Sequence, residues 1–227
     1  MFRRVGTELW KEATVPGTIH TDLIRHSLIQ DPFYGDNETK IQWVSKAEWE
    51  YKTFFHADLN KRAQGVYLRF HGLDTYADVL LNGICILHAD NMFRTYDVEI
   101  SSFLKYENEL SIVFHSAELK ADSIAKTYLP FIRPCENNRH YVRKAQFHFG
   151  WDWAPKIITS GIWRDVELIY GSLPQAIPSQ QSSVQLIQQS DSIGQAFYFT
   201  ENGKPIYMKG ANWVPADVFL PRVKKEK

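Results

Sequence analysis

The sequence is poor in cysteine, and its two cysteines do not suggest a covalent or metal-bound framework. Cys85 and Cys135 are too few for a set of disulfides, and no group of cysteines and histidines has the spacing of a zinc site. We therefore expect no metal and no cofactor. Cys85 stands in an apolar segment, which predicts a buried free thiol. The redox compartment stays open.

The sequence also lacks an excess of charge and lacks long apolar runs. Lysine and arginine together number 26, as do aspartate and glutamate, so the formal net charge is zero. A nucleic-acid or anionic membrane partner normally requires a basic patch, and we expect neither partner. No segment has the about 20 apolar residues of a transmembrane helix. No apolar run follows Met1–Arg4, so we expect no signal peptide, and localisation is undetermined.

Aromatic residues are abundant, at 14% of the chain, which suits a β-rich protein without requiring one. Several segments alternate apolar and polar residues, and this pattern predicts strands. The asparagine–glycine pair at 82–83 predicts a hairpin turn between two of these strands. Strands that recur without long helices between them indicate an antiparallel sandwich. We predict a mostly β protein with a jelly-roll β-sandwich over about residues 45–171, and an Ig-like sandwich is the alternative. The predicted strands are Trp49–Phe55, Val66–Phe70, Asp78–Leu81, Ile84–Leu87, Thr95–Ile100, Leu110–His115 and Val166–Tyr170.

The segments before the sandwich show weaker patterns. Residues 1–12 are polar and offer no clear strand partner. Apolar residues at helical spacing predict a short helix from about Thr18 to Leu28, and Glu118–Thr127 predicts a second one. The loop Pro32–Glu38 is rich in turn formers and aromatics, and it either lines a site or covers the end of a sheet.

The composition changes after Tyr170. Residues 171–183 are rich in serine, glutamine and proline, which predicts a linker. Val184–Ile187 predicts a lone strand, and Asn202-Gly203 predicts a hairpin turn. These pieces are too small to bury a core of their own.

The most informative stretch is Trp151-Asp152-Trp153, within the long excursion between Asn108 and Asp165. Indole faces stack on the apolar C–H surfaces of sugars, and a carboxylate accepts hydrogen bonds from paired hydroxyls. Two interpretations are open, a sugar-binding site and a packed corner in which Asp152 binds local backbone N–H groups. Loops of this length are usually functional or disordered, and the aromatic content argues against disorder.

Three charged or titratable residues stand close to this motif. We interpret Arg143 and Lys144 as solvated charges rather than counter-ions of Asp152. We interpret His148 as a structural histidine rather than a catalytic base.

Six stretches together resemble, in family order, the N-terminal part of β-mannosidases, in the glycoside hydrolase group that also contains β-galactosidases and β-glucuronidases. The resemblance implies a jelly-roll domain without its opening strand at 1–171, a remnant of an Ig-like sandwich at 172–193 and the start of a TIM barrel at 194–227. A whole sandwich needs about 100 residues and a closed barrel about 250, so the chain is expected to be internally deleted and to hold a truncated barrel. The six stretches are Val15–Leu23, Asp31–Glu38, Asn91–Arg94, His148–Pro155, Thr159–Val166 and Asn202–Asp217.

The resemblance implies exo-hydrolysis of terminal non-reducing β-D-mannose residues with retention, by two glutamates on late barrel strands. In the family the acid/base glutamate directly follows an asparagine. Asn37-Glu38 and Asn108-Glu109 offer that pair, but neither is expected at the end of a barrel strand. We therefore expect that the catalytic residues are absent and that this chain alone is inactive.

The resemblance carries over substrate-binding residues only. It implies that Trp151, Asp152 and Trp153 help to form the pocket for a terminal mannose of a β-mannoside glycan, with Trp213 and Asn212 lining the same pocket. Trp213 is also explained as an aromatic packed beneath the barrel. Two further functions stay open, a non-catalytic carbohydrate-binding module and a structural sandwich without a sugar ligand.

The resemblance also bears on association and localisation. The motif loop of a whole family member packs against barrel surface that this chain lacks. We therefore expect exposed aromatics around Trp151 and Trp213, and self-association through them. A full-length member is expected to be lysosomal, or secreted or periplasmic.

Overall fold

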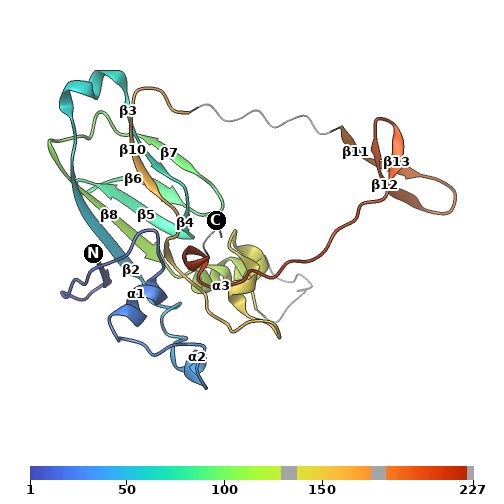
Figure 1. Cartoon of the computed structure of the whole chain (residues 1–227), viewed down its shortest axis with the longest axis horizontal. Coiled ribbons are helices and arrows are strands. Elements are labelled where there is room, and N and C mark those ends of the chain that lie inside the picture. The colour runs from blue at the N-terminus through green and yellow to red at the C-terminus, as the bar shows by residue number, and fades with distance from the viewer. Residues whose placement is uncertain (129–136, 175–182, 224–227) are drawn as a thin grey trace. The chain divides into compact units, whose positions relative to one another are not determined.

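Alternation of apolar and polar residues builds antiparallel sheets in both parts of the chain (Figure 1). The computed structural model describes residues 1–128, 137–174 and 183–223. Unit 1 comprises Met1–Leu173 with Pro215–Lys227, and unit 2 comprises Pro174–Val214. Strands predominate, which confirms the prediction of a mostly β protein. Cys135 and most of the predicted linker lie outside the described residues.

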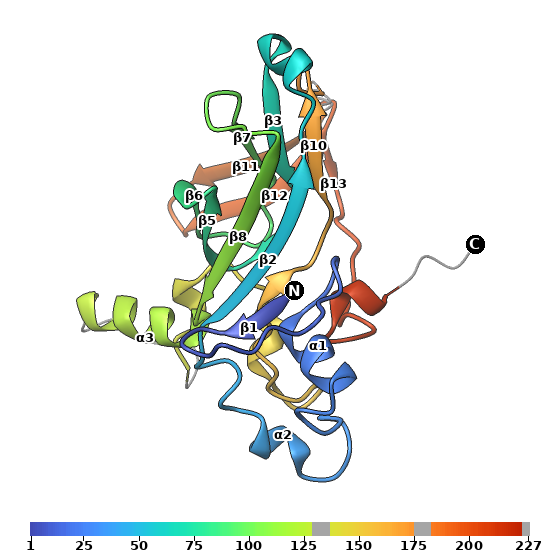
Figure 2. The same cartoon turned by 90° about the vertical axis from the view of Figure 1, so that its left-hand side faces the viewer.

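Unit 1 is a sandwich of two main sheets (Figure 2). The larger sheet has the strand order β1-β2-β8-β5-β6 and the smaller has the order β10-β3-β7, with antiparallel neighbours throughout. A short pair, β4 (Leu73–Asp74) with β9 (Gly161–Ile162), lies outside both. The strands of the two main sheets are β1 (Phe2–Arg4), β2 (Trp49–His56), β3 (Val66–Phe70), β5 (Tyr76–Leu81), β6 (Ile84–Ala89), β7 (Tyr96–Glu99), β8 (Glu107–His115) and β10 (Val166–Tyr170).

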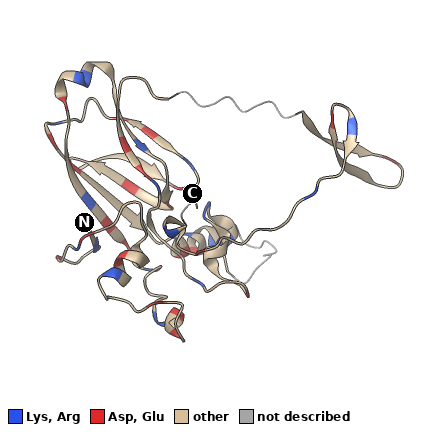
Figure 3. Ribbon diagram, in the orientation of Figure 1, with Lys and Arg blue, Asp and Glu red and all other residues tan. Residues whose placement is uncertain are grey.

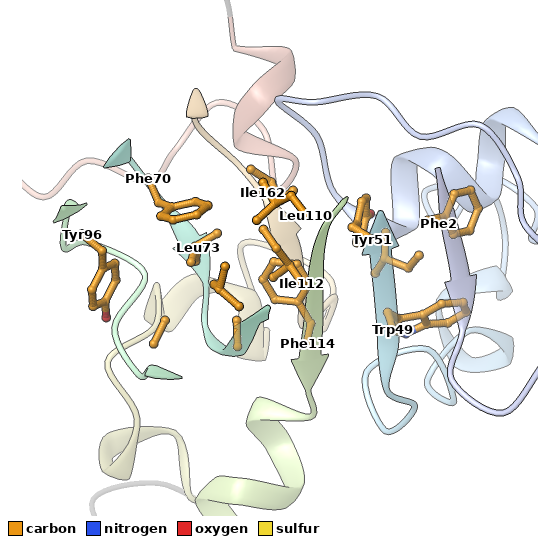
Figure 4. Close-up of a cluster of buried hydrophobic side chains, with 14 of the residues drawn as sticks. Phe2, Trp49, Tyr51, Phe70, Leu73, Tyr96, Leu110, Ile112, Phe114 and Ile162 are labelled. Atoms are coloured by element: carbon orange, nitrogen blue, oxygen red, sulfur yellow. The ribbon is translucent and has the colours of Figure 1, made fainter. Parts of the chain in front are cut away.

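One apolar core packs between the two sheets (Figure 4). Every second residue of β3 and of β5 is buried, as the period of two along a strand requires. Phe70 of the smaller sheet and Ile112 and Phe114 of the larger one are almost wholly buried in this core. The seven strands predicted for the sandwich are all present, and the bounds of β3 and β10 are as predicted. Asn82 and Gly83 have φ of 53° and 83°, as the predicted hairpin turn requires.

The N-terminus departs from the prediction. Phe2–Arg4 forms β1 and pairs with Trp49–Tyr51 of β2, although no strand partner was predicted for residues 1–12. Phe2 is buried against the rings of Trp49 and Tyr51. Burial of the Phe2 ring therefore stabilises this strand, although the neighbouring residues are polar.

The helices lie close to their predicted positions. Helix α1 (Ile19–Arg25) begins at the capping residue Thr18, and it ends earlier than predicted because Ser27 has a left-handed φ of 55°. Helix α3 (Ala117–Thr127) confirms the second prediction. A further short helix, α2 (Asn37–Lys40), follows the aromatic loop. Among the described helices, none is long and apolar enough to cross a bilayer.

Cys85 is exposed, so the prediction of a buried thiol is wrong. The residue lies on β6, an edge strand of the larger sheet, and its side chain is on the outer face of that sheet rather than in the core. Its Sγ is 3.6 Å from Nε2 of His88. The apolar residues next to Cys85 in the sequence therefore led to a wrong prediction of its burial.

Unit 2 is a sheet of three antiparallel strands in the order β11-β12-β13. Strand β11 (Val184–Ser190) pairs along its whole length with β12 (Gln195–Glu201), so the expectation of a lone strand is wrong. The predicted turn at Asn202-Gly203 joins β12 to β13 (Lys204–Ile206). The division of this region into a sandwich remnant and a barrel start stays a prediction.

Lys144 was predicted to be solvated, and this prediction is also wrong. Its side chain is wholly buried, and Nζ lies 2.5 and 2.6 Å from the two carboxylate oxygens of Asp74. The Thr159 hydroxyl donates to the same carboxylate at 2.6 Å. Burial alone would raise the pKa of Asp74, but the Lys144 charge, with His148 and the two hydrogen-bond donors, lowers it overall.

Figure 3 shows that other charged residues are spread over the ribbon with both signs interspersed.

Replacing Lys144 by methionine would leave the Asp74 carboxylate buried without its cation. We expect the free energy of unfolding to fall by about 3–5 kcal/mol. The matched control is Lys156→Met, because Lys156 pairs with Glu118 at a partly exposed position and its loss should cost less than about 1 kcal/mol. Urea titrations followed by tryptophan emission measure both values, and equal losses would contradict the importance of the buried pair.

Candidate functional site

The motif Trp151-Asp152-Trp153 forms a tight turn. The backbone N–H of Trp151 donates to the carbonyl of Ala154 at 3.1 Å, and the N–H of Ala154 donates back to Trp151 at 3.3 Å. Gly150 precedes the turn with a φ of 76°, and a Cβ at this position would lie 2.9 Å from the backbone of Lys156. Only glycine fits so close to the returning chain. The turn therefore holds two indoles and one carboxylate at its tip.

Both indoles are open to solvent. Trp151 is 58% exposed and Trp153 is 50% exposed, and their ring centroids are 6.1 Å apart. Asp152 is exposed between them. Within the described part of the chain, its carboxylate makes no hydrogen bond and no ion pair. This geometry differs from a packed corner, in which the acid would bind local backbone groups.

A hollow of about 510 Å³ lies against the turn. One wall is the turn itself, and the other is formed by the aromatic loop, with Phe33, Gly35 and Glu38. The volume is within the range of about 300–1,000 Å³ that is usual for small-molecule sites. The loop thus lines a candidate site, which was one of the two roles left open for it.

Hydrogen bonds fasten the loop to the turn. An oxygen of the Glu38 carboxylate accepts from the backbone N–H of Lys156 at 2.6 Å. The side-chain amide of Gln42 donates to the carbonyl of Lys156 at 2.8 Å. Both backbone groups of Lys156 are thereby held, so the two walls of the hollow are fixed relative to each other.

The segment Pro215–Val223 supports the loop from behind, although it lies far along the chain. Phe219 is wholly buried, with its ring centroid 5.9 Å from Phe33 and 6.0 Å from His20. His148 is buried as well, and its Nε2 lies 3.0 Å from the carbonyl oxygen of Val218. His148 is therefore a structural histidine, as predicted.

The sequence placed Glu38 in a loop that could line a site, but it did not identify the contact that Glu38 makes. It did not identify Gln42 or Phe219 as part of this site. The loop was noted for its aromatics, but nothing in the sequence indicates that Glu38 binds the backbone of a residue far along the chain. Phe219 gives no local signal either, because it is one apolar residue in a short tail. Each of these contacts depends on the tertiary fold.

Two predicted site residues lie in the other unit. Trp213 and Asn212 belong to unit 2, and Trp213 is 86% exposed. The exposed aromatics expected around Trp151 and Trp213 are therefore present. A pocket shared by all five predicted residues stays a prediction.

The two asparagine–glutamate pairs lie outside any barrel. Glu38 is in α2, where its carboxylate binds the Lys156 backbone. Glu109 is in strand β8 of the sandwich, and it pairs with Lys52 at 2.9 Å. Across the described residues, no three histidine, cysteine or acidic side chains are grouped so that they could hold a metal ion.

Two buried histidines next to this site predict an acid-sensitive fold. Burial, followed by the charge of Lys144, lowers the pKa of both His20 and His148 to about 3. An unfolded histidine binds a proton below about pH 6.5. As the pH falls from about 6.5 to about 3, the unfolded chain therefore takes up protons that the folded chain does not.

We expect the free energy of unfolding to decrease over this interval by up to about 1.4 kcal/mol per pH unit for each histidine. His148→Gln should make the decrease less steep, because one of the two buried histidines is then absent. Urea titrations between pH 7 and pH 4 measure the slope. An unchanged slope in His148→Gln would contradict the assignment.

Comparison of the sequence with known proteins identifies a matching family. The sequence model of the "Glycosyl hydrolase 2 galactose-binding domain-like" family matches residues 1–164. "Beta-mannosidase B" of Thermothelomyces thermophilus is 46% identical over 162 residues, which cover 69% of this chain and 19% of that protein. "Beta-mannosidase" of Mus musculus is 28% identical over 330 residues, which cover 95% of this chain and 38% of that protein.

A solved structure agrees. The β-D-mannosidase of Dictyoglomus thermophilum matches with a TM-score of 0.81 and 28% identity, over 98% of this chain and 40% of that one. The chain thus spans between about a fifth and two fifths of the length of these relatives. The resemblance to the N-terminal part of β-mannosidases is confirmed, and so is the jelly-roll sandwich over the Ig-like alternative. On this evidence the chain belongs to the glycosyl hydrolase 2 galactose-binding domain-like family.

Proposed function

We propose that this chain is the sugar-recognition part of a retaining exo-β-mannosidase and that it binds a terminal β-mannosyl residue. The observation that carries the proposal is the pair of exposed indoles on either side of the unpaired Asp152 carboxylate, at the edge of an open hollow. The names of the relatives, which are β-mannosidases, give the sugar its identity.

The chemistry of the turn suits a pyranose ring. An indole face packs against the apolar C–H surface of the ring, and Trp151 and Trp153 offer two such faces at a mutual tilt of 43°. Asp152 can accept hydrogen bonds from two neighbouring hydroxyls, which are stronger than bonds to a neutral acceptor. We assign Trp213 and Asn212 to the same pocket from the family resemblance.

We further propose that most of an Ig-like sandwich is missing from within this chain. The alignment with the mouse protein runs over 330 positions, whereas 95% of this chain is about 216 residues, so about 114 positions have no counterpart here. That difference is close to the about 100 residues of one such sandwich. The alignment with the relative from Thermothelomyces thermophilus runs over 162 positions and uses 69% of the chain, about 157 residues, so it has few gaps. We place the missing positions after residues 1–164, which the family model matches.

The proposed reaction needs a pair of carboxyl groups that we do not find among the residues the structure describes. Retaining glycosidases use two carboxyl groups about 5–5.5 Å apart. Glu38 is engaged with a backbone N–H, and Glu109 is paired with Lys52 in the sandwich. We therefore assign to this chain the binding of the sugar and not the cleavage of its bond.

The purified chain should not hydrolyse an aryl β-mannoside. We expect the release of the aryl alcohol to equal that of a buffer blank, because of the two carboxylates that line the hollow Glu38 is held by the backbone N–H of Lys156 and we assign Asp152 to binding the sugar. The measurement is a continuous absorbance assay. Turnover that persists through purification and disappears in Asp152→Asn would contradict the proposal.

The chain should nevertheless bind a β-mannoside weakly, with quenching of its tryptophan emission. Trp151→Ala should abolish the response, and Asp152→Asn should weaken binding about tenfold or more, because hydrogen bonds to a charged acceptor are lost. Trp43→Ala is the matched control, since Trp43 is similarly exposed but lies outside the hollow. Fluorescence titration measures each affinity. No response in the folded wild-type chain would favour a structural sandwich.

A non-catalytic carbohydrate-binding module is the second candidate. It is favoured by one observation, that the residues lining the hollow all come from unit 1. Recognition would then need no barrel residue. Equal affinity in the wild-type chain and in Trp213→Ala would favour this candidate over a shared pocket.

A further inference from the structure

An exposed thiol belongs to a hydrogen-bonded cluster on the outer face of the larger sheet. Cys85 is free and exposed, and its Sγ lies 3.6 Å from Nε2 of His88. Nδ1 of the same imidazole ring lies 2.6 Å from Oδ1 of Asp78. A thiol, an imidazole and a carboxylate are therefore in contact in that order.

An irregularity in the sheet brings Cys85 and His88 to the same face. Residues three apart on a regular strand point to opposite faces, because side chains alternate. Here Cys85 lies opposite Leu80 of β5 and His88 lies opposite Asp78, with a shift of register between the two pairs. Leu80 and Asp78 are two residues apart and share a face, so their partners share it as well. Bulges of this kind re-aim side chains and are frequent next to active sites.

The carboxylate of Asp78 is held from its other side as well. Its Oδ2 lies 3.0 Å from Nε2 of His115, whose Nδ1 lies 2.6 Å from the carboxylate of Glu48. Partial burial would raise the pKa of Asp78, but the hydrogen bonds from His88 and His115 lower it overall. Asp78 is therefore an anion of fixed orientation at neutral pH, and it favours the tautomer of His88 that carries its proton on Nδ1.

That tautomer leaves Nε2 of His88 as a proton acceptor beside the thiol. The thiolate, and not the thiol, is the nucleophile in cysteine chemistry. A base next to the nucleophile, oriented in turn by a carboxylate, is the general arrangement that activates such a group. Because Cys85 is exposed, its sulfur is also open to a reagent from solution.

An open hollow of about 910 Å³ adjoins the cluster. Its walls include Asp78, His88 and His115. The volume is within the range of about 300–1,000 Å³ that is usual for small-molecule sites. None of its lining residues lines the hollow at Trp151, so this cluster is separate from the sugar site.

We propose that Cys85 is a reactive thiol that exchanges with small disulfides such as glutathione disulfide, with His88 as its base and Asp78 as a positioning residue. Nε2 of His88 takes the proton of the thiol, and the resulting thiolate attacks one sulfur of the disulfide. A new S–S bond forms between Cys85 and that sulfur while the S–S bond of the reagent breaks. The departing thiolate takes the proton from His88, so one disulfide is consumed and one is formed.

The rate of mixed-disulfide formation with glutathione disulfide at pH 7 tests the proposal. The parent chain carries Cys135→Ser, which leaves Cys85 as its single cysteine. An ordinary cysteine is only a few per cent thiolate at this pH, so we expect Cys85 to react about tenfold faster than the thiol of N-acetylcysteine amide. Intact-mass spectrometry measures the rate. A rate equal to that of the model thiol would overturn the proposal.

His88→Gln should slow the reaction about tenfold, because the base is lost. The His88 side chain is 78% exposed, so its replacement removes little packing. The matched control is His56→Gln, since His56 is likewise exposed and 3.3 Å from a carboxylate, but lies on β2, which two strands separate from β6. Equal rates in His88→Gln and in the parent chain would contradict the role of His88.

His88→Ala gives a readout that a purely structural role of this residue would not give. Free imidazole can enter the space of the lost ring and take up the thiol proton. We therefore expect added imidazole to restore the rate in His88→Ala and to leave it unchanged in His88→Gln, where the glutamine side chain occupies that space. Equal acceleration of the two variants, or of neither, would overturn the assignment of His88 as the base.

Discussion

The carboxylate of Asp74 is the constraint on which the candidate site depends. It is buried at the end of β4, where it binds Lys144 on the chain that leads into the motif and Thr159 on the chain that leads away. A buried carboxylate needs such partners, because its desolvation is otherwise too costly. Both flanks of the excursion are therefore held at one point of the sandwich, and the turn at Trp151 projects from a fixed base. Without this anchor, the two indoles would lie on a long loop with no fixed position relative to the sandwich.

The hollow is assembled from three parts of the chain that are distant in sequence. The motif turn provides the indoles, the loop with Phe33 and Glu38 provides the facing wall, and Phe219 packs behind that wall. Backbone hydrogen bonds to Lys156 join the first two parts. A site with such walls would lose little conformational entropy on binding a ligand, although its open form leaves much of the ligand in water.

The strands and turns could be predicted because their signals are local. Alternation in Val66–Phe70 and the pair Asn82-Gly83 depend on neighbouring residues alone, and both predictions hold. The errors concern residues whose partners are remote. Lys144 is a surface residue by type, and only Asp74, far along the chain, makes it a core residue. Cys85 has apolar neighbours, yet its place on the outer face of an edge strand exposes it. The motif could be identified from the sequence because two indoles and a carboxylate can recognise a sugar in any fold.

The central claim is that the turn at Trp151 receives a sugar ring, and the indole N–H signals of the seven tryptophans test it most directly. We would titrate a ¹⁵N-labelled chain with methyl β-mannoside and assign the signals by single substitutions. The account predicts that the signals of Trp151 and Trp153 shift with a common affinity, while those of Trp43 and Trp49 stay in place. Shifts confined to other tryptophans, or no shift at saturating sugar, would contradict it.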